Sequence, residues 1–143
     1  MVDRALLLRK LAELEEYLKQ IRDYANITIE QYSSDWRIQR IVERTLQIMI
    51  ETCVDIAGHI ISDRGYRIPN SYAATFRILY ENNKLGKELF ETMEKMAKFR
   101  NIVVHNYDEV NAAIVVNILR RHLDDFLAYK NAILRILKEP NNN

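Results

Sequence analysis

The sequence of 143 residues contains little glycine, proline or cysteine. It has 3 glycines and 2 prolines, far below their average usage. Because few positions favour sharp turns, we expect long helices joined by few connections. A single cysteine, Cys53, excludes an intrachain disulfide. Its position inside an apolar run indicates a buried thiol that packs as a small hydrophobic side chain.

The chain also lacks an excess of either charge and a long uninterrupted apolar run. Its 21 basic and 20 acidic residues leave a net charge of +1. A protein that coats nucleic acid or binds an anionic membrane is usually more basic, so any RNA contact must be local. The longest apolar stretch, LQIMIETCVDIAGHII, contains Glu51 and Asp55, which argues against a membrane span. No secretory signal stands at the N-terminus, and we expect a cytoplasmic location without membrane contact.

Several common catalytic and binding motifs are absent from the sequence. There is no G-x-x-x-x-G-K-[ST] phosphate loop, no G-x-S-x-G elbow and no G-x-G-x-x-G dinucleotide motif. None of the three histidines follows a glutamate by three residues, as a di-metal site in a helical bundle would require. One cysteine and three scattered histidines also argue against a structural zinc site. We therefore expect no metal and no cofactor.

Apolar residues recur at helical spacing along the chain, and no strand-like alternation competes with them. The first helix begins near Asp3, a plausible N-cap. A second helix is expected from about residues 33–35 to Ser62. The apolar stripe predicted for the first helix consists of Leu7, Leu11, Leu14, Leu18, Ile21 and Ala25. The stripe predicted for the second consists of Ile38, Ile41, Thr45, Met49, Cys53, Ile56 and Ile60.

The stretch DRGYRIPNS breaks the helical pattern, and a short helix over residues 72–80 follows it. A fourth helix carries apolar residues from position 85 to Val104. Residues 105–107 interrupt it, and Asp108 is predicted to cap a last helix that continues to Leu137. The predicted fold is all-α: an up-and-down bundle of four to five helices. We expect one domain over residues 1–143, with residues 141–143 as a disordered tail.

Two polar groups on the second helix allow both a structural and a functional interpretation. Arg37, Arg40 and Arg44 are spaced three and four apart. A solvated flank is the ordinary explanation for them, and a phosphate-facing flank is the alternative. Asp55 and His59 share one helix face. Since Asp55 lies in an apolar segment, a buried carboxylate there would need a partner, such as an arginine from another helix.

The stretch RNIVVHNY, residues 100–107, places polar side chains at the end of an apolar helix. Val103 and Val104 are expected in the core. On an unbroken helix Arg100 and Tyr107 would share a face, whereas His105 would lie roughly 140° from Arg100. The three side chains converge only if the helix ends or kinks near His105.

An arginine and a histidine suffice in principle for RNA cleavage without a metal. The guanidinium of Arg100 can bind a phosphate with two parallel hydrogen bonds and stabilise its developing charge. His105 can remove the 2′-hydroxyl proton or protonate the leaving oxygen. Because one histidine is few for both roles, a symmetric dimer would have to bring a second Arg-His pair to the same cleft. Spacing alone would favour a structural role.

Arg100-Asn101-x-x-x-His105-x-Tyr107 resembles the signature of the HEPN-domain ribonucleases, and its His-x-Tyr ending resembles their HepT toxin branch. The stretches RIVERTLQIMIETCVDIAGHII and GYRIPNSYAATFRIL are similar to the same branch, so the resemblance covers about residues 36–137.

The resemblance implies a HEPN helical bundle that forms a homodimer, with the two motifs meeting in a cleft between the subunits. The implied activity is metal-independent endoribonuclease cleavage of RNA that arrests growth, with Arg100 and His105 catalytic and Asn101 supporting them. The implied partner is a small MNT-type nucleotidyltransferase antitoxin, which transfers AMP from ATP to the position of Tyr107. Arg37, Arg40 and Asp55 are further expected near the cleft, from helix position only.

Two alternatives compete with the ribonuclease toxin. In the first, the bundle is a non-catalytic module that binds a nucleotide or a nucleotidyltransferase, and the Arg-His group only holds phosphate. In the second, the chain is a purely structural dimer in which Arg100 pairs with Asp55 or an equivalent acid.

Overall fold

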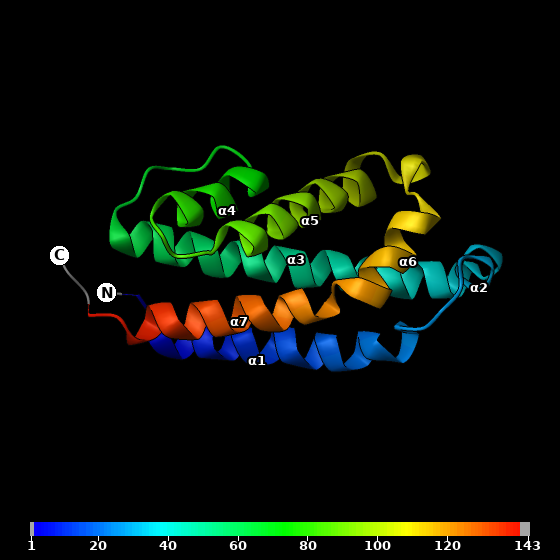
Figure 1. Ribbon diagram of the computed structural model, residues 1–143, viewed down its shortest axis with the longest axis horizontal. Helices are drawn as coiled ribbons and strands as arrows, with labels where there is room; N and C mark the ends of the chain where they lie inside the picture. The colour runs from blue at the N-terminus through cyan, green and yellow to red at the C-terminus, as the bar shows by residue number, and fades with distance from the viewer. Residues whose placement is uncertain (1, 141–143) are drawn as a thin grey trace.

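The fold is a bundle of helices, seen in a computed structural model that describes residues 2–140 (Figure 1). The α-helices are α1 (Arg4–Ile21), α2 (Ile29–Ser34), α3 (Trp36–Arg64), α4 (Tyr72–Glu81), α5 (Lys87–His105), α6 (Ala112–Arg121) and α7 (Leu123–Lys138). Two 3₁₀ helices, η1 (Arg22–Tyr24) and η2 (Tyr107–Glu109), complete the described elements. No strand forms within residues 2–140, so the all-α prediction is confirmed.

Local capping signals define most helix starts. The Asp3 carboxylate accepts a hydrogen bond from the backbone N–H of Leu6 at 3.0 Å, and Asp35 caps α3 in the same way. The Ser71 side chain caps α4 by accepting a hydrogen bond from the backbone N–H of Ala74 at 3.0 Å. Gly65 ends α3 with φ of +68°, a left-handed conformation that glycine adopts without steric cost.

The long helix α3 lies at the centre of the arrangement. It packs against α1 on one side and against α4 and α5 on the other, and α7 runs beside α1 (Figure 1). The beginning of α1 and the end of α7 meet where Arg4 Nη1 donates to the Leu137 carbonyl at 2.8 Å. One apolar core connects these helices, and the buried Tyr129 hydroxyl donates to the Cys53 carbonyl across it at 2.7 Å. Cys53 is buried, as expected.

The apolar stripe predicted for α3 is partly wrong. Ile41 is exposed, whereas Val42, Leu46 and Ile50, which the stripe omits, are fully buried. The reason is that α3 contacts helices on two sides, so its buried surface is broader than one stripe. The stripe of α1 from Leu7 to Ile21 is buried as predicted.

The last predicted helix is in fact two helices. Asp108 lies in η2, and the side chain of Asn111 caps α6 instead, accepting from the backbone of Ala113 at 2.8 Å. The chain then breaks at His122, whose backbone leaves helical geometry and whose ring nitrogen lies 2.8 Å from Asp125. This break and the short α2 raise the number of α-helices described within residues 2–140 to seven.

Two further expectations concern the C-terminal residues and the absence of a membrane span. Residues 141–143, predicted as a tail, lie outside the described residues. Within the part of the chain that is described, no helix combines the length and apolar character needed to cross a membrane.

Candidate functional site

The RNIVVHNY motif lies at the C-terminal end of α5. The helix remains regular through His105, and the Asn106 N–H still donates to the Ile102 carbonyl at 2.9 Å. At Asn106 the backbone turns away, with φ of −132° and ψ of 53°, and η2 begins with Tyr107. The predicted break near His105 is confirmed, and it separates Tyr107 from the helix that carries Arg100 and His105.

Arg100 is held by two other helices. Its Nε donates to Glu51 Oε2 of α3 at 2.8 Å, and its Nη2 lies 2.6 Å from the same oxygen. The guanidinium also lies 4.5 Å from the ring centre of Tyr72, the first residue of α4. The Arg100 side chain is only 15% exposed. Ionic and cation–π contacts thus fix a guanidinium at the edge of the core.

Asn101 and Gln47 extend this arrangement. Arg100 Nη1 donates to Asn101 Oδ1 at 3.3 Å, and Gln47 Nε2 donates to Glu51 Oε2 at 3.2 Å. Asn101 lies one helical turn before His105, so these two side chains leave α5 on the same face. Asn101 therefore stands between the held arginine and the histidine.

His105 is exposed at the last position of α5. Within residues 2–140, its side chain forms no hydrogen bond or ion pair. Because α5 stays helical from Arg100 to His105, the two side chains leave the helix about 140° apart. A single subunit therefore does not pair them directly.

Tyr107 begins η2, just after the end of α5, and contacts α3. Its ring lies 4.7 Å from the Arg40 guanidinium, and the residue is 40% exposed. Arg40 thus contacts a residue of the motif, and its place near a cleft between subunits stays a prediction. Arg37 stacks instead on its neighbour Trp36, 5.6 Å from the ring centre.

Asp55 differs from its expected role. It is half-exposed rather than buried, and its carboxylate pairs with Lys10 Nζ of α1 at 2.5 Å, with His59 3.7 Å away. The acid that pairs with Arg100 is Glu51, one turn earlier on α3, so the pair forms with an equivalent acid rather than with Asp55. Both carboxylates border one open hollow of about 480 Å³ beside Tyr72.

Two residues of this site, Glu51 and Tyr72, are absent from the sequence prediction. A signal for Glu51 exists, since it is one of only two acids within the apolar stretch of the second helix. Tyr72 gives no such signal, because an aromatic residue at the start of a helix is commonly part of the core.

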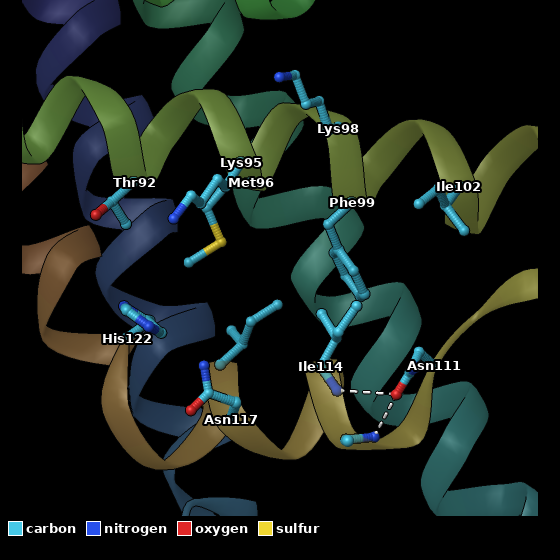
Figure 2. A pocket seen from close by; sticks show the side chains of 12 residues that line it. Thr92, Lys95, Met96, Lys98, Phe99, Ile102, Asn111, Ile114, Asn117 and His122 are labelled. Carbon is cyan, nitrogen blue, oxygen red and sulfur yellow. Dashed lines mark hydrogen bonds between the residues drawn. The ribbon is translucent and has the colours of Figure 1, made fainter.

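A second, apolar groove lies between α5 and α6 (Figure 2). It has a volume of about 540 Å³, and Met96, Phe99, Ile102 and Ile114 supply much of its lining. Lys95 and Lys98 stand on its α5 side. Neither Arg100 nor His105 lines it, so it is separate from the motif contacts described above.

Comparison with known proteins identifies the family of this chain. The family model described as "Ribonuclease HepT-like" matches residues 14–133. The chain belongs to the HepT-like ribonuclease family. This HepT-like chain is 34% identical over 129 residues to the mRNA nuclease HepT of Shewanella oneidensis, an alignment that covers 90% of the chain and 96% of the relative. It is 27% identical to the tRNA nuclease HepT of Aphanizomenon flos-aquae, with 98% and 97% of the two chains covered.

Solved structures agree with this HepT-like assignment. One is the tri-AMPylated Shewanella oneidensis HEPN toxin in complex with MNT antitoxin. The TM-score is 0.84 and the sequence identity is 33%, and the match covers 94% of this chain and 99% of that chain. Another is a toxin–antitoxin complex with AMP-PNP, with a TM-score of 0.82, 33% identity and coverage of 93% and 99%. The HEPN fold expected from the motif is therefore confirmed.

Proposed function

We propose that this chain is the toxin of a type II toxin–antitoxin pair and acts as a metal-independent endoribonuclease. The observation that carries the proposal is the guanidinium of Arg100, which Glu51 and Tyr72 hold near the end of α5, five residues before the exposed His105. The mRNA and tRNA nuclease activities named for HepT relatives support it. We place this activity in the cytoplasm.

The proposed reaction is an internal transfer at a ribose phosphate. The 2′-oxygen of RNA attacks the adjacent phosphorus while the bond from phosphorus to the 5′-oxygen breaks. The 2′-hydroxyl proton passes to a base and the 5′-oxygen receives a proton from an acid, which leaves a 2′,3′-cyclic phosphate and a 5′-hydroxyl end. Arg100 stabilises the charge on the non-bridging oxygens. His105 serves as the base or as the acid, and Asn101 orients Arg100 through their hydrogen bond.

A homodimer would supply the second proton-transfer group. Within one subunit Arg100 and His105 leave α5 about 140° apart, so one subunit does not bring them together. A two-fold axis near the helix end would place one subunit's histidine near the other's. Val104, expected in the core, is 39% exposed on the turn after Arg100. An exposed valine inside the motif supports a contact between subunits there.

Tyr107 is the proposed target of an MNT-type nucleotidyltransferase antitoxin. The tyrosine oxygen would attack the α-phosphate of ATP, with pyrophosphate leaving and the hydroxyl proton released. Its exposed position suits such a partner, and related HEPN toxins are named as AMPylated and as complexed with MNT antitoxin. The added phosphate and base, two residues from His105, would compete with RNA for the site. Arg40, which contacts Tyr107, and Arg37, one turn earlier on α3, would then meet RNA or the added nucleotide.

Expression in a bacterial host tests the function against the non-catalytic binding module. The nuclease arrests growth on expression, and His105→Ala removes the arrest at equal protein level. A substrate with a single 2′-deoxy residue at the scissile position tests the reaction, because it lacks the attacking oxygen and stays intact. Equal arrest by His105→Ala, or cleavage at the deoxy position, would reject this mechanism.

A further inference from the structure

We propose that Glu51 is a positioning residue for RNA cleavage, which fixes the guanidinium of Arg100 in the orientation that receives the scissile phosphate. The inference deepens the proposed function and rests on it. Arg100 Nε donates to Glu51 Oε2 at 2.8 Å, and Nη2 lies 2.6 Å from that same oxygen. One carboxylate oxygen thus holds one side of the guanidinium.

The remaining contacts leave donors of Arg100 available. A guanidinium carries five N–H groups, one on Nε and two on each terminal nitrogen. Glu51 engages Nε and Nη2, and Asn101 engages Nη1. One N–H therefore remains on each terminal nitrogen, and these are the two donors that we assign to the phosphate. The Tyr72 ring at 4.5 Å prevents the guanidinium from rotating toward α4.

Glu51 is itself held in place. It lies on α3 among fully buried neighbours such as Ile50 and Cys53, and Gln47 Nε2 donates to the same carboxylate oxygen at 3.2 Å. The Glu51 side chain is 30% exposed, so it can act on Arg100 without being sealed in the core. Since its negative charge lies beside the phosphate position, it opposes RNA binding. Its contribution must therefore appear in the rate of the chemical step.

A second ion pair between α4 and α5 provides a matched control. Arg77 Nη2 lies 2.7 Å from Glu94 Oε2, and the Arg77 guanidinium stacks 5.1 Å from the Phe90 ring centre. This group repeats the arginine, glutamate and aromatic ring found at Arg100, on a part of α5 away from the motif. Glu94→Ala thus measures what the loss of such an ion pair does to the fold alone.

The test compares steady-state RNA cleavage by the full-length variants. Glu51→Ala is expected to lower kcat about 100-fold, the order of effect produced by a misplaced catalytic group, while KM stays equal or falls. Glu51→Gln keeps an acceptor oxygen and is expected to lose about 10-fold or less in kcat, because the Nε hydrogen bond can persist. Glu94→Ala is expected to stay within about twofold of the wild type, like most surface changes away from a site.

A double-mutant cycle separates positioning from stability. Arg100→Lys lacks the fixed fork of donors, so adding Glu51→Ala to it should reduce kcat by less than about threefold. Three results would overturn the inference. The first is that Glu51→Ala lowers kcat as much in the Arg100→Lys background as in the wild type. The others are an unchanged kcat in Glu51→Ala and a loss of kcat in Glu94→Ala equal to that in Glu51→Ala. If Glu51→Ala loses its helical circular dichroism, the same cycle is measured with the folded Glu51→Gln variant. Its kcat values then decide whether Glu51 acts through Arg100.

A spectroscopic measurement keeps this inference distinct from the proposed nuclease. The ¹⁵N-detected Nε–H signal of Arg100, assigned by its absence in Arg100→Lys, should be sharp and slowly exchanging in the wild type. It should broaden or vanish in Glu51→Ala and persist in Glu94→Ala. An unchanged signal in Glu51→Ala overturns the positioning role even where RNA is cleaved, and a wild type that fails to cleave RNA rejects the proposed function instead.

Discussion

The guanidinium of Arg40 lies 4.7 Å from the centre of the Tyr107 ring. This contact joins α3 to η2, immediately after the end of α5. Eleven residues later, about three helical turns, the same helix holds Arg100 through Glu51. The helix α3 therefore fixes both the arginine proposed for cleavage and the tyrosine proposed for modification.

Tyr107→Phe should retain RNA cleavage and escape AMP transfer. The substitution removes only the hydroxyl that would attack ATP, while the ring can still stack on Arg40. The measurement is incorporation of label from α-labelled ATP by the nucleotidyltransferase, with Tyr66→Phe as the control that accepts label normally. Wild-type labelling of Tyr107→Phe would place the modification elsewhere, and loss of its cleavage would make the hydroxyl catalytic.

Val104→Glu should weaken the homodimer and abolish cleavage without unfolding the helices. In a two-fold dimer about the motif, the new carboxylates would face one another, and apposed like charges cost several kcal/mol. Sedimentation velocity should show the dimer dissociating at concentrations at least about 100-fold higher. Leu8→Glu, an exposed change on α1, is the control. A dimer and a cleavage rate both unchanged in Val104→Glu would exclude this interface.

Tyr32→Phe should destabilise the fold by about 1–3 kcal/mol. Glu43 is a buried acid, 5% exposed, and the Tyr32 hydroxyl donates to its Oε2 while Oε1 has no partner among the described residues. Burial and this hydrogen bond raise the pKa of Tyr32. Urea unfolding at pH 7 measures the change, with Tyr17→Phe as a control expected within about 0.5 kcal/mol. Equal stability of the two variants would show that the hydrogen bond contributes nothing.

Cys53 should resist thiol reagents while the protein is folded. Burial raises the pKa of its thiol well above the ordinary value, and the reactive form is the thiolate. A raised folded-state pKa stabilises the fold fully below the unfolded pKa of about 8.5 and progressively less above it. Reaction with a chromogenic disulfide at pH 8 should be at least about 100-fold slower than in denaturant. Rapid reaction of the folded chain would contradict the burial.

Much of the fold is predictable from local features of the sequence. Periodic apolar residues and caps such as Asp3, Asp35 and Ser71 lie within a few residues of the boundaries they define. The break at His122 escapes prediction because neither glycine nor proline accompanies it. A backbone turn stabilised by one side-chain pair, His122 with Asp125, leaves little trace in composition.

The site is only partly predictable for a related reason. The resemblance to the HEPN signature points to Arg100, Asn101, His105 and Tyr107, but the acid that holds Arg100 depends on how α3 is rotated against α5. Glu51 and Asp55 both interrupt the same apolar run, one turn apart. Packing turns the first toward Arg100 and the second toward Lys10 of α1. The exposure of Val104 likewise depends on where the neighbouring helices end.

The central claim is that Arg100 and His105 cleave RNA without a metal. The direct measurement is the cleavage rate of single-stranded RNA in excess EDTA by the wild type, Arg100→Ala and His105→Ala, with His59→Ala as a control. The wild type and the control should cleave, and each motif variant should lose at least about 100-fold with unchanged helical circular dichroism. Cleavage by both motif variants at the wild-type rate would contradict the account.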